Sequence, residues 1–246
     1  MAKKTTPSKK TSAKKPEKKR TTGQKIFRFF WLLFLWFNII SFSVVLLFKF
    51  VPVPFTPLMG IRVMEHKKEN KEMTCSHDWV PIDEISLNLQ KAVIASEDGR
   101  FLEHSGFDFE AMQKAFKNNQ KGKRLKGGST ISQQTAKNVF LWQGRSYVRK
   151  GLEAYYTVLI ELIWGKKRIM EVYLNSIEMG DGVYGAEAAA KHWYRKDAAS
   201  LTRYEAAGIA AILPNPRKYK ASNSSSYINR RKAKISREIG YVKLDY

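Results

Sequence analysis

Hydrophobic positions divide the chain into one long apolar run near its beginning and a series of shorter segments with helical spacing. Residues 29–48 hold no charged side chain and are apolar on every side of a helix, as a membrane-spanning helix requires. In the later segments, apolar residues recur every three to four positions. These segments begin near Asp83, Thr130, Val148, Lys166, Ala186 and Arg203. Alternating runs of Val, Ile and Thr are nearly absent, so the sequence predicts a mostly α fold.

Capping residues mark the beginnings of the predicted helices. Asp83 or Ser86 can cap the first, which ends at Gly99. Thr130 can cap the second, with Gln133 reaching back to it as in a capping box. The third carries an apolar stripe made of Val148, Leu152, Tyr155, Leu159 and Leu162.

These patterns divide the chain into five parts. Residues 1–28 form a disordered basic tail, 29–49 a transmembrane helix, and 50–80 a linker that leads into the domain. Residues 81–220 form the main domain, and 221–246 a basic C-terminal segment with a short peripheral helix. Within the linker, the pattern suggests a strand around Ile61–Met64.

The apolar run has two other interpretations, which the residues make less favourable. A buried core helix would not be apolar on every side. A cleaved secretory signal has a shorter apolar region and a small-residue cleavage site, which residues 51–54 do not provide. We therefore expect a single membrane anchor.

Charge predicts the orientation of this anchor. Eleven Lys or Arg side chains precede the apolar run and Glu17 alone opposes them, so the N-terminus should remain in the cytoplasm. The rest of the chain then lies outside the cytoplasmic membrane, in an extracytoplasmic or periplasmic space. The tail supplies about +10 of the formal net charge of +22. A basic domain held at a bilayer favours anionic lipids as partners, and the anchor argues against nucleic acid.

Two short stretches are too polar for a core. The first holds Glu97, Asp98, Phe101, His104 and Asp108. A carboxylate where a helix leaves the core is partly buried, which raises its pKa toward the range of a general base. Alone, Glu97 reads better as a surface charge and His104 as a structural histidine, so the cluster carries the hypothesis. The four histidines and the lone Cys75 do not have the spacing of a metal site, so we predict no structural zinc.

The second stretch begins with glycines and a helix N-terminus. Gly128 allows close backbone approach, and free N–H groups at the helix start favour an anion. Its polar residues would then form a cradle for a diphosphate and sugar hydroxyls. They are Ser129, Thr130, Gln133, Gln134, Lys137 and Asn138. An ordinary capped helix with a solvated polar face fits the same residues equally well.

Two further helices add polar side chains. Arg145, Arg149 and Glu153 lie at the start of the third helix, and Arg149 can pair with Glu153 or reach a phosphate. On the fourth, Glu171, Tyr173 and Asn175 are expected to support the site from behind.

Together these stretches resemble the peptidoglycan glycosyltransferases, over about residues 80–217 and the anchor. The blocks that carry the resemblance are Glu97-Asp98-x-x-Phe101-x-x-His104-x-Gly106-x-Asp108, Gly127-Gly128-Ser129-Thr130-Ile131-Ser132-Gln133-Gln134-x-x-Lys137-Asn138, Arg149-Lys150-x-x-Glu153, Arg168-Ile169-Met170-Glu171-x-Tyr173-Leu174-Asn175, and Gly182-Val183-Tyr184-Gly185-x-Glu187-Ala188-Ala189 followed by Leu213-Pro214-Asn215-Pro216. Ser132 departs from this pattern, where Thr is commoner.

The resemblance implies a lysozyme-like fold and the polymerisation of lipid II into β-1,4-linked glycan strands, with inversion and release of undecaprenyl diphosphate. By motif, Glu97 is the general base, and Glu153 assists at the leaving group. Asp98, Phe101, His104 and the residues of the cradle would contact substrate, as would Arg145 and Arg149. Residues 109–126 correspond to a mobile jaw that touches the membrane.

The resemblance also bears on cofactors and partners. No cofactor is required, with Mg²⁺ or Mn²⁺ as an optional aid to the diphosphate. The partners are lipid II, the growing lipid-linked glycan, the membrane and, as candidates, other cell-wall synthesis proteins.

Two rival functions stay open on the sequence. A lysozyme-like muramidase would need an acid for the glycosidic oxygen but no diphosphate cradle. A noncatalytic membrane-tethered scaffold for wall synthesis would tolerate the loss of Glu97.

Overall fold

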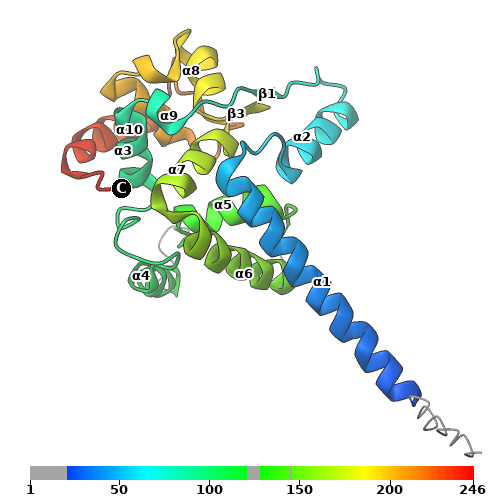
Figure 1. Cartoon of the computed structure of the whole chain (residues 1–246). Coiled ribbons are helices and arrows are strands. Elements are labelled where there is room, and N and C mark those ends of the chain that lie inside the picture. Colours follow the sequence, from blue (N-terminus) through cyan, green and yellow to red (C-terminus); the bar gives the residue numbers. More distant parts are fainter. Residues whose placement is uncertain (1–20, 121–127, 145) are drawn as a thin grey trace, which may run out of the picture. The chain divides into compact units, whose positions relative to one another are not determined.

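The computed structural model describes residues 21–120, 128–144 and 146–246 (Figure 1). The chain forms two compact units, residues 1–42 and residues 43–246. Helix α1 (Thr22–Phe50) is the one described helix that is long and apolar enough to cross a membrane. It begins at Thr22, earlier than the predicted Phe29, and takes in the end of the segment expected to be disordered. The tail before residue 21 lies outside the described residues.

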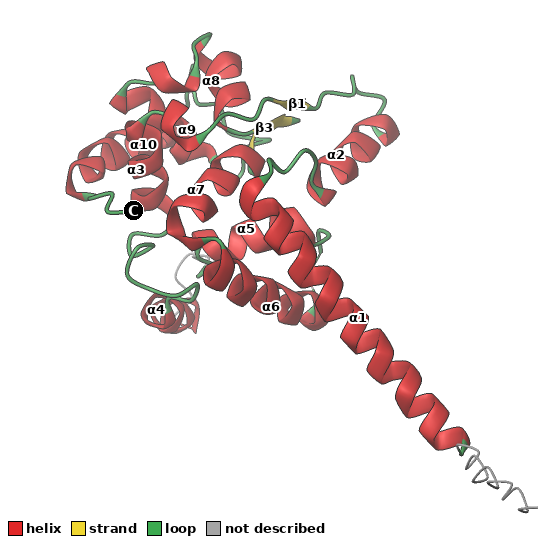
Figure 2. Ribbon diagram, in the orientation of Figure 1, coloured by secondary structure: helices red, strands yellow, loops and turns green. Residues whose placement is uncertain are grey.

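Eight helices of the larger unit follow the linker region among the described residues, with short 3-10 turns before α3, between α8 and α9, and after α10 (Figure 2). They are α3 (Leu87–Glu97), α4 (Phe109–Gln120), α5 (Ile131–Phe140), α6 (Tyr147–Ile163), α7 (Gly165–Ser176), α8 (Ala186–Tyr194), α9 (Arg203–Ile212) and α10 (Ser226–Glu238). The mostly helical fold and its predicted caps are confirmed. The Ser86 hydroxyl accepts the Asn88 N–H at the start of α3, and Thr130 forms the capping box with Gln133 at α5.

The expected strand around Ile61–Met64 is wrong, because these residues lie in helix α2 (Pro57–Lys68). The Thr56 hydroxyl caps this helix by accepting the Met59 N–H at 3.3 Å, and Pro57 takes the first helical position. His66, Lys67 and Lys68 in the last turn complement the helix dipole. Local end signals therefore outweigh the strand preference of Ile61 and Val63.

A small sheet connects the segment after α2 to the middle of the domain. Its strands are β1 (Ser76–His77), β2 (Glu178–Gly180) and β3 (Val183–Tyr184), in the order β1-β3-β2. Strands β1 and β3 run parallel, with Ser76 beside Val183, while β2 and β3 are antiparallel.

The C-terminal helix is part of the core, so the peripheral segment predicted from residue 221 is wrong. Helix α10 packs on α9 and α3. Its residues Ile228 and Ile235 are buried two turns apart, and the buried Lys232 ammonium donates to the Ala221 carbonyl at 3.0 Å. The main domain therefore extends at least through α10. The alanines of α9 permit this close packing, since Ala206, Ala207 and Ala210 are all buried.

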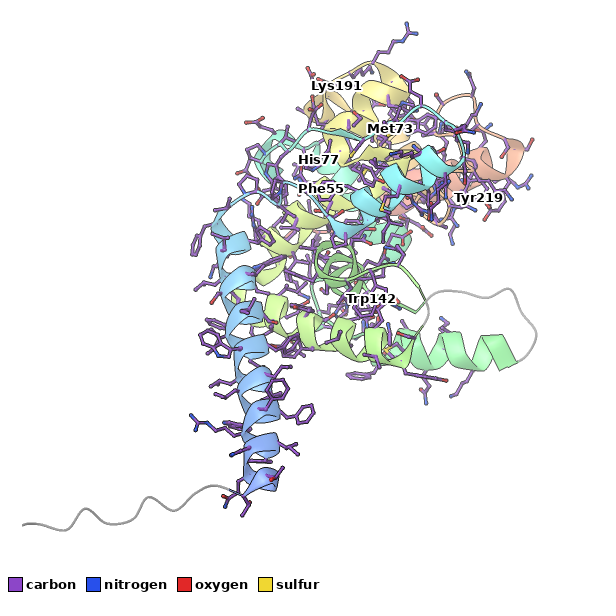
Figure 3. All side chains as sticks on the ribbon, turned by 90° about the vertical axis from the view of Figure 1, so that its right-hand side faces the viewer. Phe55, Met73, His77, Trp142, Lys191 and Tyr219 are labelled. Atoms are coloured by element: carbon purple, nitrogen blue, oxygen red, sulfur yellow. The ribbon has the colours of Figure 1, made fainter. Side chains whose placement is uncertain are left out.

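The apolar stripe predicted for α6 is exposed at its two ends and partly buried at Leu152, Tyr155 and Leu159. Val148 and Leu162 expose 71% and 77% of their surface, whereas Glu153, Thr157 and Ile160 are buried. Trp142, in the segment between α5 and α6, is also exposed (Figure 3).

The last turns of α1 belong to the larger unit and are fixed by α6 and α7. The Trp164 indole N–H donates to the Val45 carbonyl at 2.7 Å. The Arg168 guanidinium donates to the carbonyls of Phe48 at 2.8 Å and Val51 at 2.6 Å. The Phe48 carbonyl is one of those that the end of a helix leaves without a partner in the helix.

Asn175 connects α7 to the segment before α3, so we expect it to stabilise the fold. Its side chain accepts the Val80 N–H at 3.0 Å and donates to the carbonyls of Val80 and Glu171, both at 2.9 Å. Asn175→Ala should lower the free energy of unfolding by about 1–3 kcal/mol, because it leaves buried backbone groups unpaired. Urea unfolding followed by circular dichroism measures this loss. Asn229→Ala, at an exposed amide of α10, is the control; equal losses in both variants would contradict the expectation.

Candidate active site

Three helices meet at the Glu97 side chain. Glu97 is the last residue of α3, and its Oε2 accepts a hydrogen bond from the Gln134 amide of α5 at 3.1 Å. The Tyr173 hydroxyl of α7 donates to the other end of this amide, at 3.3 Å. Burial raises the pKa of Glu97, and the Gln134 hydrogen bond opposes this rise. The site therefore holds a half-buried carboxyl group whose proton affinity is higher than usual.

Asp98 points into the protein, which differs from its predicted contact with substrate. Its Oδ2 accepts the Ile131 N–H at 2.9 Å, at the N-terminus of α5. The His104 Nε2–H donates to Oδ1 at 3.0 Å. Both side chains are nearly buried, so His104 also organises the loop instead of facing a ligand. The pair fixes the end of α3 against the start of α5.

The loop after Glu97 is fastened at three more points. The Thr130 hydroxyl donates to the Gly106 carbonyl at 2.6 Å. The Lys166 ammonium donates to the His104 carbonyl at 2.6 Å and to Glu161 Oε1 at 2.7 Å. It also lies 4.6 Å from the centroid of the Phe101 ring. Phe101 is fully buried, so the expected substrate contact is wrong for this residue: its ring packs in the core.

The predicted cradle divides into a buried part and an open part. Thr130 and Gln133 are buried, and their side chains form the hydrogen bonds of the capping box. Asn138 is buried as well. Gln134 and Lys137 remain half-buried, three residues apart on α5, and Gly128 and Ser129 precede the helix. The sequence predicts that Gln133 and Lys137 share the polar face of this helix. In the structure the partly exposed polar residues of that face are Gln134 and Lys137.

A cluster of cations lies where α5 packs on α6. Glu153 of α6 is 3% exposed, and its Oε2 accepts a bond from Arg149 Nη1 at 2.8 Å while Oε1 pairs with the Lys150 ammonium. Burial lowers the pKa of Lys137, Glu153 raises it, and the charges of Arg149 and Lys150 lower it further. Because these charges act on Lys137, its ammonium group lies close to Arg149, Lys150 and Glu153 of α6. The predicted Arg145 lies outside the described residues.

Of the α7 residues predicted to support the site, Tyr173 contacts Gln134, whereas Glu171 and Asn175 contact Arg168, Val80 and each other. Tyr173 is buried and orients Gln134, and its own pKa is raised by burial and by the charges of Glu97 and Asp98. Glu171 pairs with Arg168 at 3.1 Å and accepts the Asn175 amide through its carbonyl.

Comparison with known proteins identifies the family. The transglycosylase family model matches residues 65–239. The chain belongs to the transglycosylase family. It is similar to the biosynthetic peptidoglycan transglycosylases of Caulobacter vibrioides (56% identity, 82% of this chain and 85% of the relative) and Bacteroides thetaiotaomicron (51% identity, 89% of this chain and 88% of the relative). A further relative of that description, from Pseudomonas syringae, is 51% identical over 83% of this chain and 87% of its own length.

The sequence did not point to several residues of this transglycosylase site. Glu161 and Lys166 fasten the Glu97 loop, and Glu161 also accepts the Ser132 hydroxyl at 2.5 Å. Arg231 of α10 lies close enough to Glu97 for its charge to lower the pKa of that carboxyl. The sequence contains a signal for Arg231: its helical spacing with Ile228 and Ile235 places it on the packed face of α10.

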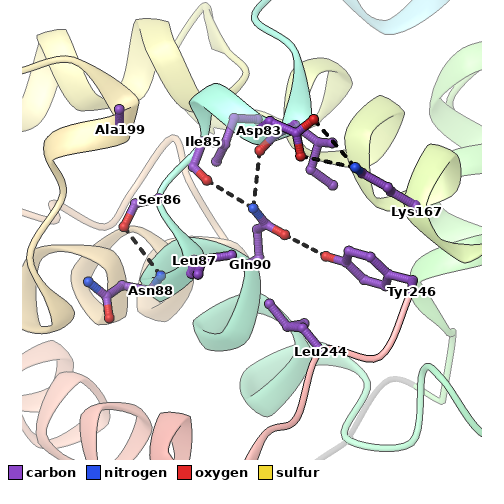
Figure 4. Close-up of a pocket in the computed structure, with 11 residues that line it drawn as sticks. Asp83, Ile85, Ser86, Leu87, Asn88, Gln90, Lys167, Ala199, Leu244 and Tyr246 are labelled. Carbon is purple, nitrogen blue, oxygen red and sulfur yellow. Dashed lines mark hydrogen bonds and ion pairs between the residues drawn. The ribbon is translucent and has the colours of Figure 1, made fainter.

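A separate pocket lies at the other end of α3 (Figure 4). It is lined by Asp83, Gln90, Lys167 and Leu244 among others, and the Tyr246 hydroxyl donates to Gln90 Oε1 at 2.5 Å across it. The described residues contain no group of three or more His, Cys, Asp or Glu side chains that could hold a metal.

Lys166 and Lys167 allow a matched test of the clamp on the Glu97 loop. Lys166→Met removes two hydrogen bonds and leaves Glu161 without its cation, so the free energy of unfolding should fall by about 1–3 kcal/mol. Lys167→Met removes an exposed pair with Asp83 and should cost about 0–1 kcal/mol. Urea unfolding of both variants measures the difference. A Lys167 variant as unstable as the Lys166 variant would argue against the clamp.

Proposed function

We propose that this chain is a peptidoglycan transglycosylase of cell wall biosynthesis, which polymerises lipid II with Glu97 as general base. The observation that carries the proposal is the half-buried Glu97 carboxyl group held by Gln134, beside a cation cluster on α5 and α6. Membership of the transglycosylase family supports the glycosyl-transfer chemistry.

In the proposed reaction, Glu97 takes the proton of the 4-hydroxyl group of the acceptor N-acetylglucosamine. That oxygen attacks C1 of the terminal N-acetylmuramic acid of the lipid-linked chain. The bond from C1 to the diphosphate oxygen breaks, and undecaprenyl diphosphate leaves with the electron pair. Attack opposite the leaving group converts an α linkage into a β-1,4 linkage. The raised pKa of Glu97 strengthens it as a base.

The leaving diphosphate gains negative charge that fixed cations can stabilise. Lys137, Arg149 and Lys150 supply three such cations, and Glu153 holds two of them in place. Because Glu153 is buried and occupied by these ion pairs, its role is to position the arginine and lysine. Gln134 lies between the proposed base and the cations that would stabilise the leaving group, since it contacts Glu97 and shares helix α5 with Lys137.

These residues do not fit a metal held by the protein. Glu153, the buried carboxylate in the cation cluster, is already paired with two cations. A divalent ion would therefore be bound by the oxygens of the diphosphate itself, as an aid to the reaction.

Helix α1 supports an anchor in the cytoplasmic membrane, with the N-terminus in the cytoplasm and the catalytic unit outside. The bonds from Trp164 and Arg168 fix the last turns of this helix to the larger unit, which the chain thereby tethers to the membrane that holds its lipid substrate. Other proteins of cell-wall synthesis are candidate partners. Exposed Phe109 and Met112 on α4 suit contact with lipid.

A muramidase is the second candidate, because a carboxyl with a raised pKa can also act as the acid of glycoside hydrolysis. The cation cluster favours transfer from a diphosphate. The two activities differ in their product, since a muramidase releases fragments from finished glycan and does not need lipid II.

Glu97→Gln should abolish polymerisation of labelled lipid II, with a loss of about 10²–10⁴-fold, because the amide cannot accept the proton. The pKa of Glu97 is raised in the folded state, so its ionised form costs stability above the ordinary carboxyl pKa. The variant should therefore unfold at an equal or higher temperature than the wild type at neutral pH.

Glu103→Gln is the matched control, at a side chain that is 63% exposed in the same loop, and should keep full activity. Gel analysis of the glycan products measures both variants. Normal polymerisation by the Glu97 variant would remove the assignment of the base, and release of fragments from finished wall would favour the muramidase.

Lys137→Met should lower kcat/KM for lipid II by about 10–10³-fold, because it removes a cation that stabilises the leaving group. Lys137→Arg keeps the charge and should recover part of the rate. Lys191→Met, at an exposed ion pair on α8, is the control and should leave the rate unchanged. A Lys137→Met variant with wild-type kcat/KM would contradict the proposed role.

A further inference from the structure

Arg231 occupies the packed face of α10. The buried residues Ile228 and Ile235 lie on this face, and Arg231 falls three residues after the first and four before the second. Helix α10 packs on α9 and α3, and Figure 1 shows α10 beside α3. The arginine is therefore directed into the domain, in contrast to its exposed neighbour Arg230.

The path of the chain after α10 places Arg231 toward the Glu97 end of α3. The 3-10 turn Ile239–Tyr241 packs on α3, and Tyr246 then reaches Gln90 in the first half of that helix. Because the chain after α10 packs on the first half of α3, the first half of α10 faces the other end of α3, where Glu97 lies. Consistent with this placement, the charge of Arg231 acts on Glu97.

Fold stability does not explain the position of this side chain. Arg231 Nε is buried and has no hydrogen-bond partner among the described residues. A buried donor without a partner costs free energy, so an arginine kept only for packing would be expected to be paired. What Arg231 does provide is a positive charge that acts on the Glu97 carboxyl group, whose pKa burial raises.

The other polar groups around Glu97 do not provide this charge. Asp98 follows Glu97 in the chain and is paired with His104. Gln134 of α5 and Tyr173 of α7 are neutral groups. The buried face of α9 is apolar, formed by Ala206, Ala207, Ile209 and Ala210. Arg231 is the cation among the described residues whose charge opposes the effect of burial on Glu97.

We propose that Arg231 is a positioning residue of the active site, which keeps the Glu97 carboxylate ionised and ready to accept the sugar proton at neutral pH. This inference rests on the proposed role of Glu97 as the base. Without the Arg231 charge, Glu97 binds its proton more tightly, and the fraction of ionised base falls on the acidic side of neutrality. At alkaline pH the carboxylate is ionised with or without the arginine.

The test is the dependence of lipid II polymerisation on pH, from about pH 5 to about pH 9, in the full chain. In Arg231→Gln the acidic limb of kcat/KM should move up by about one pH unit, so that the loss is about tenfold at the acidic end and small at the alkaline end. Arg231→Lys retains the charge and should keep the limb near its wild-type position. Arg230→Gln changes the adjacent exposed arginine and should match the wild type.

A direct titration gives a second readout that does not need activity. The ¹³C resonance of the Glu97 carboxyl carbon, assigned with Glu97→Gln, should titrate at higher pH in Arg231→Gln than in the wild type. If Arg231→Gln does not fold, Arg231→Lys carries the test: a limb displaced by a full unit despite the retained charge would overturn the proposal.

The outcomes separate this inference from the proposed function. A rate that falls equally at every pH, with an unmoved limb and an unmoved resonance, would show a merely structural Arg231 and overturn the inference alone. A wild-type chain that does not polymerise lipid II, or a fully active Glu97→Gln, would instead overturn the proposed function.

Discussion

The arrangement of the site depends on one buried carboxylate, that of Asp98. It accepts hydrogen bonds from the first backbone N–H of α5 and from the His104 ring, and so it joins the end of α3 to the start of α5. A negative charge is stable there because the helix dipole and the unpaired N–H groups favour it. Glu97 precedes Asp98 and Gln134 follows Ile131 by one turn, so this one contact sets the position of the base relative to the amide that holds it.

The two carboxyl groups in this loop have different partners. Asp98 accepts hydrogen bonds from the Ile131 N–H and from the His104 ring, whereas Glu97 accepts one from the Gln134 amide, and burial raises the pKa of Glu97. The proposed function requires the environment of Glu97, since a general base must bind its proton more strongly than a surface carboxylate does. The surrounding loop compensates through Thr130, Lys166 and Glu161, which fix the backbone around the destabilised group.

Local signals in the sequence predict helices and caps well, and distant packing poorly. Ser86 and Thr130 cap their helices as expected, because a cap depends on residues three positions apart. Periodicity alone placed α10 at the periphery, because a short basic helix with few apolar residues does not show which surface it covers. For the site, polar density pointed to Glu97 and to Lys137 and Arg149, and these stay predictions. It could not separate Gln133, which is buried, from Gln134 and Lys137, because that depends on how α5 is rotated in the fold, nor could it show that the loop after α3 buries Phe101.

The cation cluster and the base both carry electrostatic cost before substrate arrives. Lys137 loses proton affinity to burial and to its neighbours Arg149 and Lys150, and Glu153 compensates only in part. A bound diphosphate would remove this cost by adding negative charge where cations are in excess, and the benefit grows as the leaving group gains charge. The interactions that destabilise the free protein are therefore those that strengthen along the reaction. In the proposed reaction such a site is better matched to the departing diphosphate than to its own empty state, because Lys137, Arg149 and Lys150 outnumber the Glu153 carboxylate, which pairs with two of them.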